Sequence, residues 1–159
     1  MQLKPAKSDK SHEDLMNMLT KTNMNELGIT LFQTHRELLC FAACLGYAIN
    51  ERSTLSSVGI DVGMAEFKSN NSESYINLIA LVETNNIDIL KEKNPNKVEN
   101  DRNLIFDEYA NAGLNKIKSW INAVDSSEFH TAIISGLVTE NFIGRPKSND
   151  EEVHVDFRN

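Results

Sequence analysis

The fold is decided by one stretch of the sequence, THRELLCFAACLGYAI, which runs from Thr34 to Ile49. It begins with a capping box, in which the Thr34 hydroxyl and the Glu37 carboxylate can each accept a hydrogen bond from a backbone N–H group that the first helical turn leaves unpaired. From residue 38 onward the stretch is apolar on nearly every side, so the predicted helix belongs at the centre of a bundle. Gly46 costs this helix about 1 kcal/mol relative to alanine, which indicates that another backbone passes close to it.

Further helices are predicted on both sides of this stretch. Apolar residues recur at three- and four-residue steps over residues 72–84 and 102–122, and the longer of these two segments is strongly amphipathic. A short helix is expected at residues 87–93, where Asn94 and Pro95 would end it. A last helix begins at residues 125–128, and Ser11 is the predicted N-cap of a short first helix.

Three segments carry no helical pattern. Residues 51–71 are rich in Ser, Asn and Gly, and they predict a long loop with one short strand at residues 58–62. Residues 1–10 are expected to form a flexible arm. Residues 145–159 are expected to form a tail that is either disordered or docks on a partner. Docking would use Val153, Val155 and Phe157, which alternate with polar residues. We therefore expect a mainly α fold, a compact bundle of about five to six helices over residues 11–144.

The composition bounds the partners that the chain can have. The formal net charge is -7 over 159 residues, whereas binding to a phosphate backbone needs clustered Lys and Arg. A protein partner is therefore expected in preference to free nucleic acid. The sequence has neither the apolar run of ~20 residues that crosses a bilayer nor an apolar segment after its N-terminal lysines, so we expect no membrane contact and a cytoplasmic location. Cys40 and Cys44 are expected to be reduced, buried thiols.

Motifs for chemistry are missing from the sequence. It contains no glycine-rich phosphate loop, no G-x-S-x-G elbow and no zinc-ligand spacing, and its histidines fall on separate segments. We therefore expect no catalytic residue, no metal site and no cofactor. The run at residues 58–63 resembles the first strand of RNase H-like nucleases, in which an aspartate at the position of Asp61 would bind metal, but the further strands of that fold are not predicted here.

Polar side chains gather on one face of the long helix predicted at residues 102–122. Paired carboxylates can do acid–base or metal chemistry when burial shifts their pKa values, although such a face is more often simply solvated. A third interpretation, which we adopt, is a contact site for another protein. This candidate interaction face comprises Arg52, Glu83, Asp107, Glu108 and Asn111.

Three blocks of sequence carry a family resemblance. The first covers residues 32–34 and 38–47 with Arg52, the second residues 78–84, and the third residues 106–114. In order and spacing they resemble the family numbered four among the small proteins associated with Dnd systems, which carry out DNA phosphorothioation in bacteria. Ser53 and Thr54 stand where that family tends to have an acid and a proline. The resemblance implies an accessory component of a phage-defence or modification–restriction locus.

These observations lead to one main hypothesis and two alternatives. The main hypothesis is a non-catalytic accessory or adaptor subunit of a bacterial antiviral defence or restriction–modification system. It would bind a larger nuclease or ATP-driven DNA translocase of the same locus and reach nucleic acid only through that protein. One alternative is a DNA-interacting or metal-dependent nuclease subunit that uses Asp61, or Asp107 with Glu108. The other is an acidic, DNA-mimicking regulator.

Overall fold

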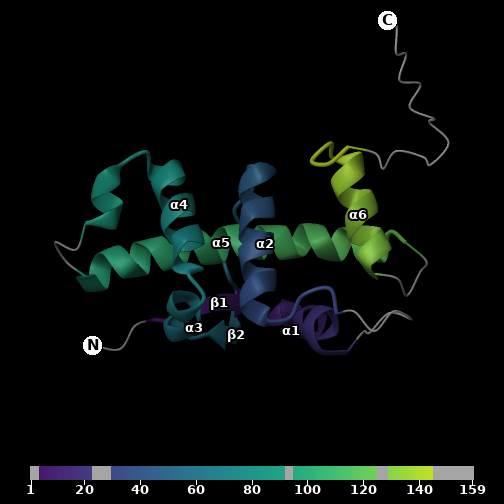
Figure 1. Cartoon of the computed structure of the whole chain (residues 1–159), viewed down its shortest axis with the longest axis horizontal. Helices are drawn as coiled ribbons and strands as arrows, with labels where there is room; N and C mark the ends of the chain where they lie inside the picture. The colour runs from purple at the N-terminus through teal and green to yellow at the C-terminus, as the bar shows by residue number, and fades with distance from the viewer. Residues whose placement is uncertain (1–3, 23–29, 92–94, 125–128, 145–159) are drawn as a thin grey trace, which may run out of the picture.

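The fold is arranged around one long helix, α5 (Pro95–Asn122), in the computed structural model. The structure describes residues 4–22, 30–91, 95–124 and 129–144. Helices α2 (His35–Ala48) and α4 (Glu73–Thr84) cross the same side of α5, and α6 (Phe129–Thr139) packs near its C-terminal end (Figure 1). The prediction of a mainly helical bundle is confirmed.

The crossing of α2 and α5 is the tightest contact of the core. A Cβ atom on Gly46 would lie 2.9 Å from the carbonyl carbon of Tyr109, and one on Gly113 would lie 2.6 Å from the carbonyl carbon of Ala42. Each helix therefore places a glycine against the backbone of the other, which lets the two axes approach closely. The close approach predicted at Gly46 is confirmed. α2 crosses α5 on one side and exposes Cys44, Tyr47 and Ala48, so the prediction that α2 itself is the central helix is corrected: α5 has that place.

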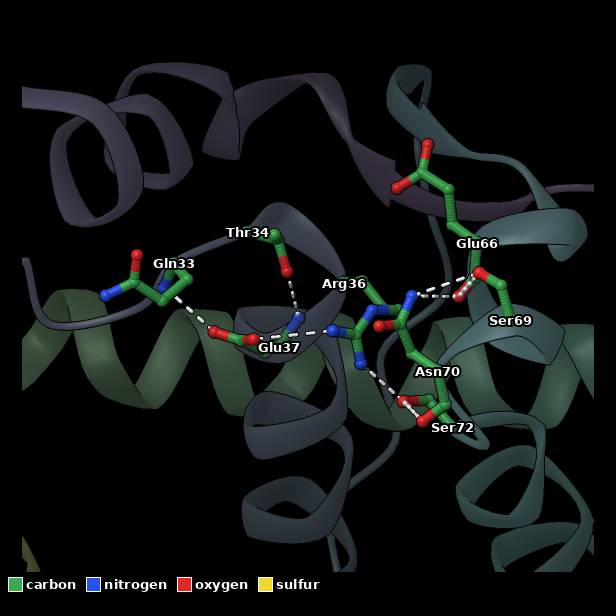
Figure 2. A network of polar contacts seen from close by, with 8 residues as sticks. All are labelled: Gln33, Thr34, Arg36, Glu37, Glu66, Ser69, Asn70 and Ser72. Atoms are coloured by element: carbon green, nitrogen blue, oxygen red, sulfur yellow. Dashed lines mark hydrogen bonds and ion pairs between the residues drawn. The ribbon is translucent and has the colours of Figure 1, made fainter.

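A capping box holds the N-terminus of α2, as predicted, but the carboxylate of Glu37 binds the N–H of Gln33 and not that of the N-cap residue Thr34. The Thr34 hydroxyl accepts the N–H of Glu37 at 3.2 Å, whereas the Glu37 carboxylate accepts the N–H of Gln33 at 2.8 Å. Figure 2 shows how this cap continues into α4, because Arg36 contacts Glu37 and also donates to the hydroxyl of Ser72, just before α4 begins. The start of α2 is thus tied to the start of α4.

A two-stranded antiparallel sheet lies beside the helices. The strand predicted at residues 58–62 is present as β2 (Val58–Val62), and it pairs with β1 (Ala6–Asp9) in the register Ala6 to Val62 and Lys7 to Asp61. A bulge interrupts the pairing at Ser8, whose hydroxyl bonds the N–H and the C=O of Ile60 instead.

The strand β1 corrects the expectation of a flexible arm over residues 1–10. Residues 6–9 are paired in the sheet, and Ala6, Ser8 and Asp9 are buried. The polar composition and Pro5 suggested a flexible arm. The strand was missed because the groups that hold it lie far away in the sequence. Residues 1–3 and the tail at 145–159, with Val153, Val155 and Phe157, lie outside the described residues.

Short elements fill the space between the sheet and the bundle. After β1 come a 3-10 turn η1 (Lys10–His12), α1 (Glu13–Asn17) and a π-helical turn η2 (Met18–Thr22). Asp9 caps the 3-10 turn η1 by accepting the N–H of Ser11 at 2.9 Å. The N-cap residue of α1 is His12, so the predicted N-cap at Ser11 is wrong by one residue. A further helix, α3 (Met64–Ser69), lies in the predicted loop, where it buries Met64 and Phe67; the 3-10 turn η3 (Ile87–Leu90) follows α4.

Candidate functional site

Arg52 joins three segments of the chain at the surface. It follows α2 and donates from Nη1 to Glu83 of α4 at 2.6 Å, and from Nε to Glu108 of α5 at 3.0 Å. Its Nη2 also donates to Glu108, and its guanidinium carbon lies 5.5 Å from the centre of the Tyr109 ring. We call Arg52, Glu83, Glu108 and Tyr109 the Arg52 cluster.

The Arg52 cluster keeps Glu83 ionised. The hydroxyl of Tyr109 and the guanidinium of Arg52 both donate to Glu83, and these bonds lower the pKa of its carboxyl. Burial, together with the bond to Glu83, raises the pKa of Tyr109 to about 12. The lowered pKa of Glu83 keeps its carboxylate charged at neutral pH, so the cluster stabilises the contact of the segment after α2 with α4 and α5.

Asp107 and Asn111 do not lie on this surface. They are 6% and 4% exposed, and with Asn103 they form a row on α5 at four-residue steps. Asn103 donates to the carbonyl of Lys4 at 3.0 Å, and Asp107 accepts the backbone N–H of Lys7 at 2.9 Å. The expectation that Asp107 and Asn111 belong to an exposed face is therefore corrected.

We call Asn103, Asp107 and Asn111 the buried polar row. Its third member, Asn111, donates to the carbonyls of Ser53 and Thr54 at 3.1 Å each. The row therefore satisfies backbone groups of two distant segments, the strand β1 and the loop after α2. Burying a backbone N–H or C=O group without a hydrogen-bond partner costs free energy. Polar side chains in this row therefore stabilise the fold in a way that apolar side chains could not.

Burial dominates the ionisation of Asp107. It raises the pKa of this carboxyl to about 8, although the N–H and the charge of Lys7 act in the opposite direction. A carboxyl with such a pKa could act as an acid or a base, but its oxygen Oδ1 is occupied by the Lys7 N–H. The position of Asp107 is that of a residue that anchors a strand.

Asp9 is a polar anchor that the sequence pattern did not reveal. Besides capping η1, it accepts bonds from the backbone N–H groups of Ser56 at 2.5 Å and of Ser57 at 3.2 Å. These bonds, together with those from Ser11, outweigh burial and lower the pKa of Asp9. The Asp-x-Ser spacing of residues 9–11 is a local signal for this turn, but nothing local points to the loop at residues 56–57.

The remaining candidates for chemistry lie outside the Arg52 cluster and the buried polar row. Asp61 is exposed on β2, Cys40 is buried, and Cys44 is exposed, which corrects the expectation that both thiols are buried. Among residues 4–22, 30–91, 95–124 and 129–144, no three His, Cys, Asp or Glu side chains are grouped closely enough to hold a metal ion. A pocket of about 270 Å³ that is open to solvent lies near β2 and the start of α2, and its lining residues are Thr20, Gln33, Thr34, His35, Asp61, Val62 and Glu66.

Replacing Arg52 with methionine is expected to lower the free energy of unfolding by about 1–2 kcal/mol, because Glu83 and Glu108 then face each other without a cation. Urea unfolding at pH 7 measures this change. Since the pKa of Glu83 is lowered in the fold, the stability that depends on its charge is present at pH 7 and is lost as the pH falls through that lowered pKa, so the difference from wild type should shrink at acidic pH.

The matched control for Arg52→Met is Lys91→Met. Lys91 pairs with Asp88 at 2.6 Å, but both side chains are more than half exposed, so about 0.5 kcal/mol or less is expected. Equal losses in the two variants would contradict the view that the Arg52 cluster links the segment after α2 to α4 and α5.

Together, the fold and the site define a small, mainly helical protein in which polar residues fasten distant segments to one central helix. No helix within the described ranges is long and apolar enough to cross a membrane. A family model described as DNA sulphur modification system-associated protein 4 matches residues 6–156. The chain therefore belongs to this family, which confirms the resemblance in the three sequence blocks. Searches of curated proteins and of solved structures gave no match.

Proposed function

We propose that this protein is a non-catalytic adaptor of a bacterial DNA phosphorothioation system with a role in antiviral defence or restriction. It acts in the cytoplasm by binding a larger nuclease or ATP-driven DNA translocase encoded with it, and it reaches DNA only through that protein. Membership of a family associated with DNA sulphur modification supports the accessory role.

One observation carries the non-catalytic part of the proposal. The acids and amide of the candidate interaction face are committed to contacts within the fold: Glu83 and Glu108 bind Arg52, while Asp107 and Asn111 bind backbone groups. Their positions are those of residues that stabilise a scaffold. The net charge of -7 supports a protein partner, because a phosphate backbone would be repelled.

Co-purification tests the adaptor function. A tagged copy of this chain should elute in a stoichiometric complex with another product of its locus when all the genes are expressed together. Elution of this chain alone would contradict the proposal. So would metal-dependent cleavage of DNA by the purified chain that is lost on Asp61→Ala or Asp107→Ala, because that result would favour the nuclease alternative.

A further inference from the structure

His12 is a buried histidine at a point where three parts of the chain meet. It is the last residue of the turn η1, directly after β1, and only 1% of its surface is exposed. Histidine is seldom buried so completely, because its ring carries a polar nitrogen on each side. The groups around the ring therefore decide which protonation state the fold accepts.

The ring faces helix α5. The side-chain amides of Asn111 and Asn115 and the ammonium group of Lys118 act on it, and these residues follow one another on α5 at steps of four and three. Lys118 also donates to the carbonyl of Ser11, the residue before His12, at 3.5 Å. Among the described residues, neither ring nitrogen has a hydrogen bond of normal geometry, and the same is true of Asn111 Oδ1. A neutral ring therefore has an amide oxygen beside it to which its single N–H can donate.

The surroundings of the ring oppose its protonation. Burial is the main cause and the charge of Lys118 adds to it, so that the pKa of His12 is lowered from its ordinary value of 6.5. Asp9 acts in the opposite direction, but its carboxylate already accepts the N–H groups of Ser11, Ser56 and Ser57. A charged ring would thus be buried beside a lysine, with no carboxylate of its own in the described part of the chain.

The same junction holds the loop that follows α2. Asp9 binds the N–H groups of residues 56–57, while Asn111 binds the carbonyls of residues 53–54. His12 connects these two anchors, because it comes three residues after Asp9 and its ring faces Asn111. The strand β1 and the loop after α2 are therefore fastened to α5 at one place.

We propose that His12 makes this junction a proton-sensitive switch: protonation of its ring loosens the contact with α5 and frees β1 together with the loop after α2. The neutral ring fits the buried site as a donor to Asn111 Oδ1, whereas the charged ring draws water into the site or stays unpaired. The loop at residues 51–57 contains Arg52, so this loosening reaches the Arg52 cluster. The switch depends on the fold alone and not on the adaptor function.

Hydrogen exchange of single amides in the full chain tests the switch. Because the folded state favours the neutral ring, its contribution to stability is complete above pH 6.5 and is lost as the pH falls below 6.5. Between pH 7 and pH 5 Asp9 stays ionised, since its pKa is lowered, and Asp107 stays largely protonated, since burial raises its pKa to about 8. The protection of the Ser57 and Lys7 amides should fall about fivefold or more over this range, after correction for the intrinsic pH dependence of exchange. In His12→Gln, which cannot be protonated, protection should change by less than about twofold.

Two further comparisons assign the effect to this ring. His130→Gln is the matched control on α6, and it should lose protection at pH 5 as wild type does. Lys118→Met keeps the proposal testable if His12→Gln does not fold. Without that cation, the titration of His12, followed by the chemical shift of its Cε1 proton, should move to higher pH, and the loss of protection at pH 5 should become smaller. Lys116→Met, whose lysine pairs with Glu140 at 2.5 Å, should leave both unchanged.

Three results would overturn the switch. The first is a loss of protection in His12→Gln that equals the loss in wild type. The second is a titration midpoint of His12 at or above 6.5, because the fold would then accept the charged ring. The third is a loss of protection at pH 5 that is uniform over α2, α5 and the junction, because such a pattern reports unfolding of the whole domain and not release of β1 and the loop.

Discussion

Gly113→Ala should destabilise the fold strongly. The added Cβ atom would lie 2.6 Å from the carbonyl carbon of Ala42, which belongs to the backbone of α2 and cannot rotate away as a side chain could. α2 and α5 would have to move apart, and the helices packed against this pair would lose contacts with it. We expect the free energy of unfolding to fall by about 3 kcal/mol, at the upper end of the cost of overpacking. Urea denaturation followed by circular dichroism measures this loss.

The control for Gly113→Ala is an alanine placed where space is open. A Cβ atom on Gly63 would have no neighbour within 4 Å, so Gly63→Ala should cost less than about 1 kcal/mol, the residual cost of a poorer cap at the start of α3. Gly46→Ala, on the other side of the same crossing, should behave like Gly113→Ala. Wild-type stability of both Gly46→Ala and Gly113→Ala would contradict the close approach of α2 and α5 at these glycines.

Asp107→Asn is expected to change how stability depends on pH. The pKa of Asp107 is raised from 3.8 to about 8 by burial, so the folded state favours the protonated carboxyl. Its stabilising contribution is complete below pH ~4 and is lost as the pH rises through 8. Asparagine has the same shape, can still accept the Lys7 N–H and cannot ionise. At pH 9 the variant should therefore be more stable than wild type by roughly 2–4 kcal/mol, and at pH 4 the two should differ by about 1 kcal/mol or less.

Measurements of unfolding at several pH values check this expectation. Asp88→Asn is the control, because Asp88 is exposed on η3 and should differ from wild type by about 0.5 kcal/mol or less at pH 4 and at pH 9. The variant minus wild-type difference removes the contributions of other groups, such as Asp9. A difference for Asp107→Asn that stays constant from pH 4 to pH 9 would contradict the raised pKa.

Local signals made much of the fold predictable. The capping box at Thr34, the apolar run behind it and the short strand at residues 58–62 each depend on neighbours within a few residues, and all three are present. α3 was missed because six residues are too few to establish a helical period in a segment rich in polar residues. β1 was missed for a different reason, since its anchors on α5 are about a hundred residues away.

The candidate site was predictable only in part. Arg52, Glu83 and Glu108, which the sequence analysis grouped as part of a face for another protein, lie together as an ion-pair cluster; the contact with a partner stays a prediction. Asp107 and Asn111 were assigned to the surface because a periodicity argument treats every polar residue of an amphipathic helix as exposed. Their partners are backbone groups, which have no signature in the sequence. The regular spacing of Asn103, Asp107 and Asn111 places all three on one side of α5, but spacing alone does not distinguish a buried polar row from a solvated one.

The anchoring of β1 on α5 also has a consequence for the order in which the protein forms during synthesis. The bonds that fix Lys4 and Lys7 need Asn103 and Asp107, which the ribosome adds about a hundred residues later. At ordinary elongation rates this is a delay of roughly 5–20 s. During that time β1 can pair with β2 and Asp9 can bind the loop at residues 56–57, but the contacts of Lys4 and Lys7 with α5 cannot form, so the native contacts of the first strand are completed late.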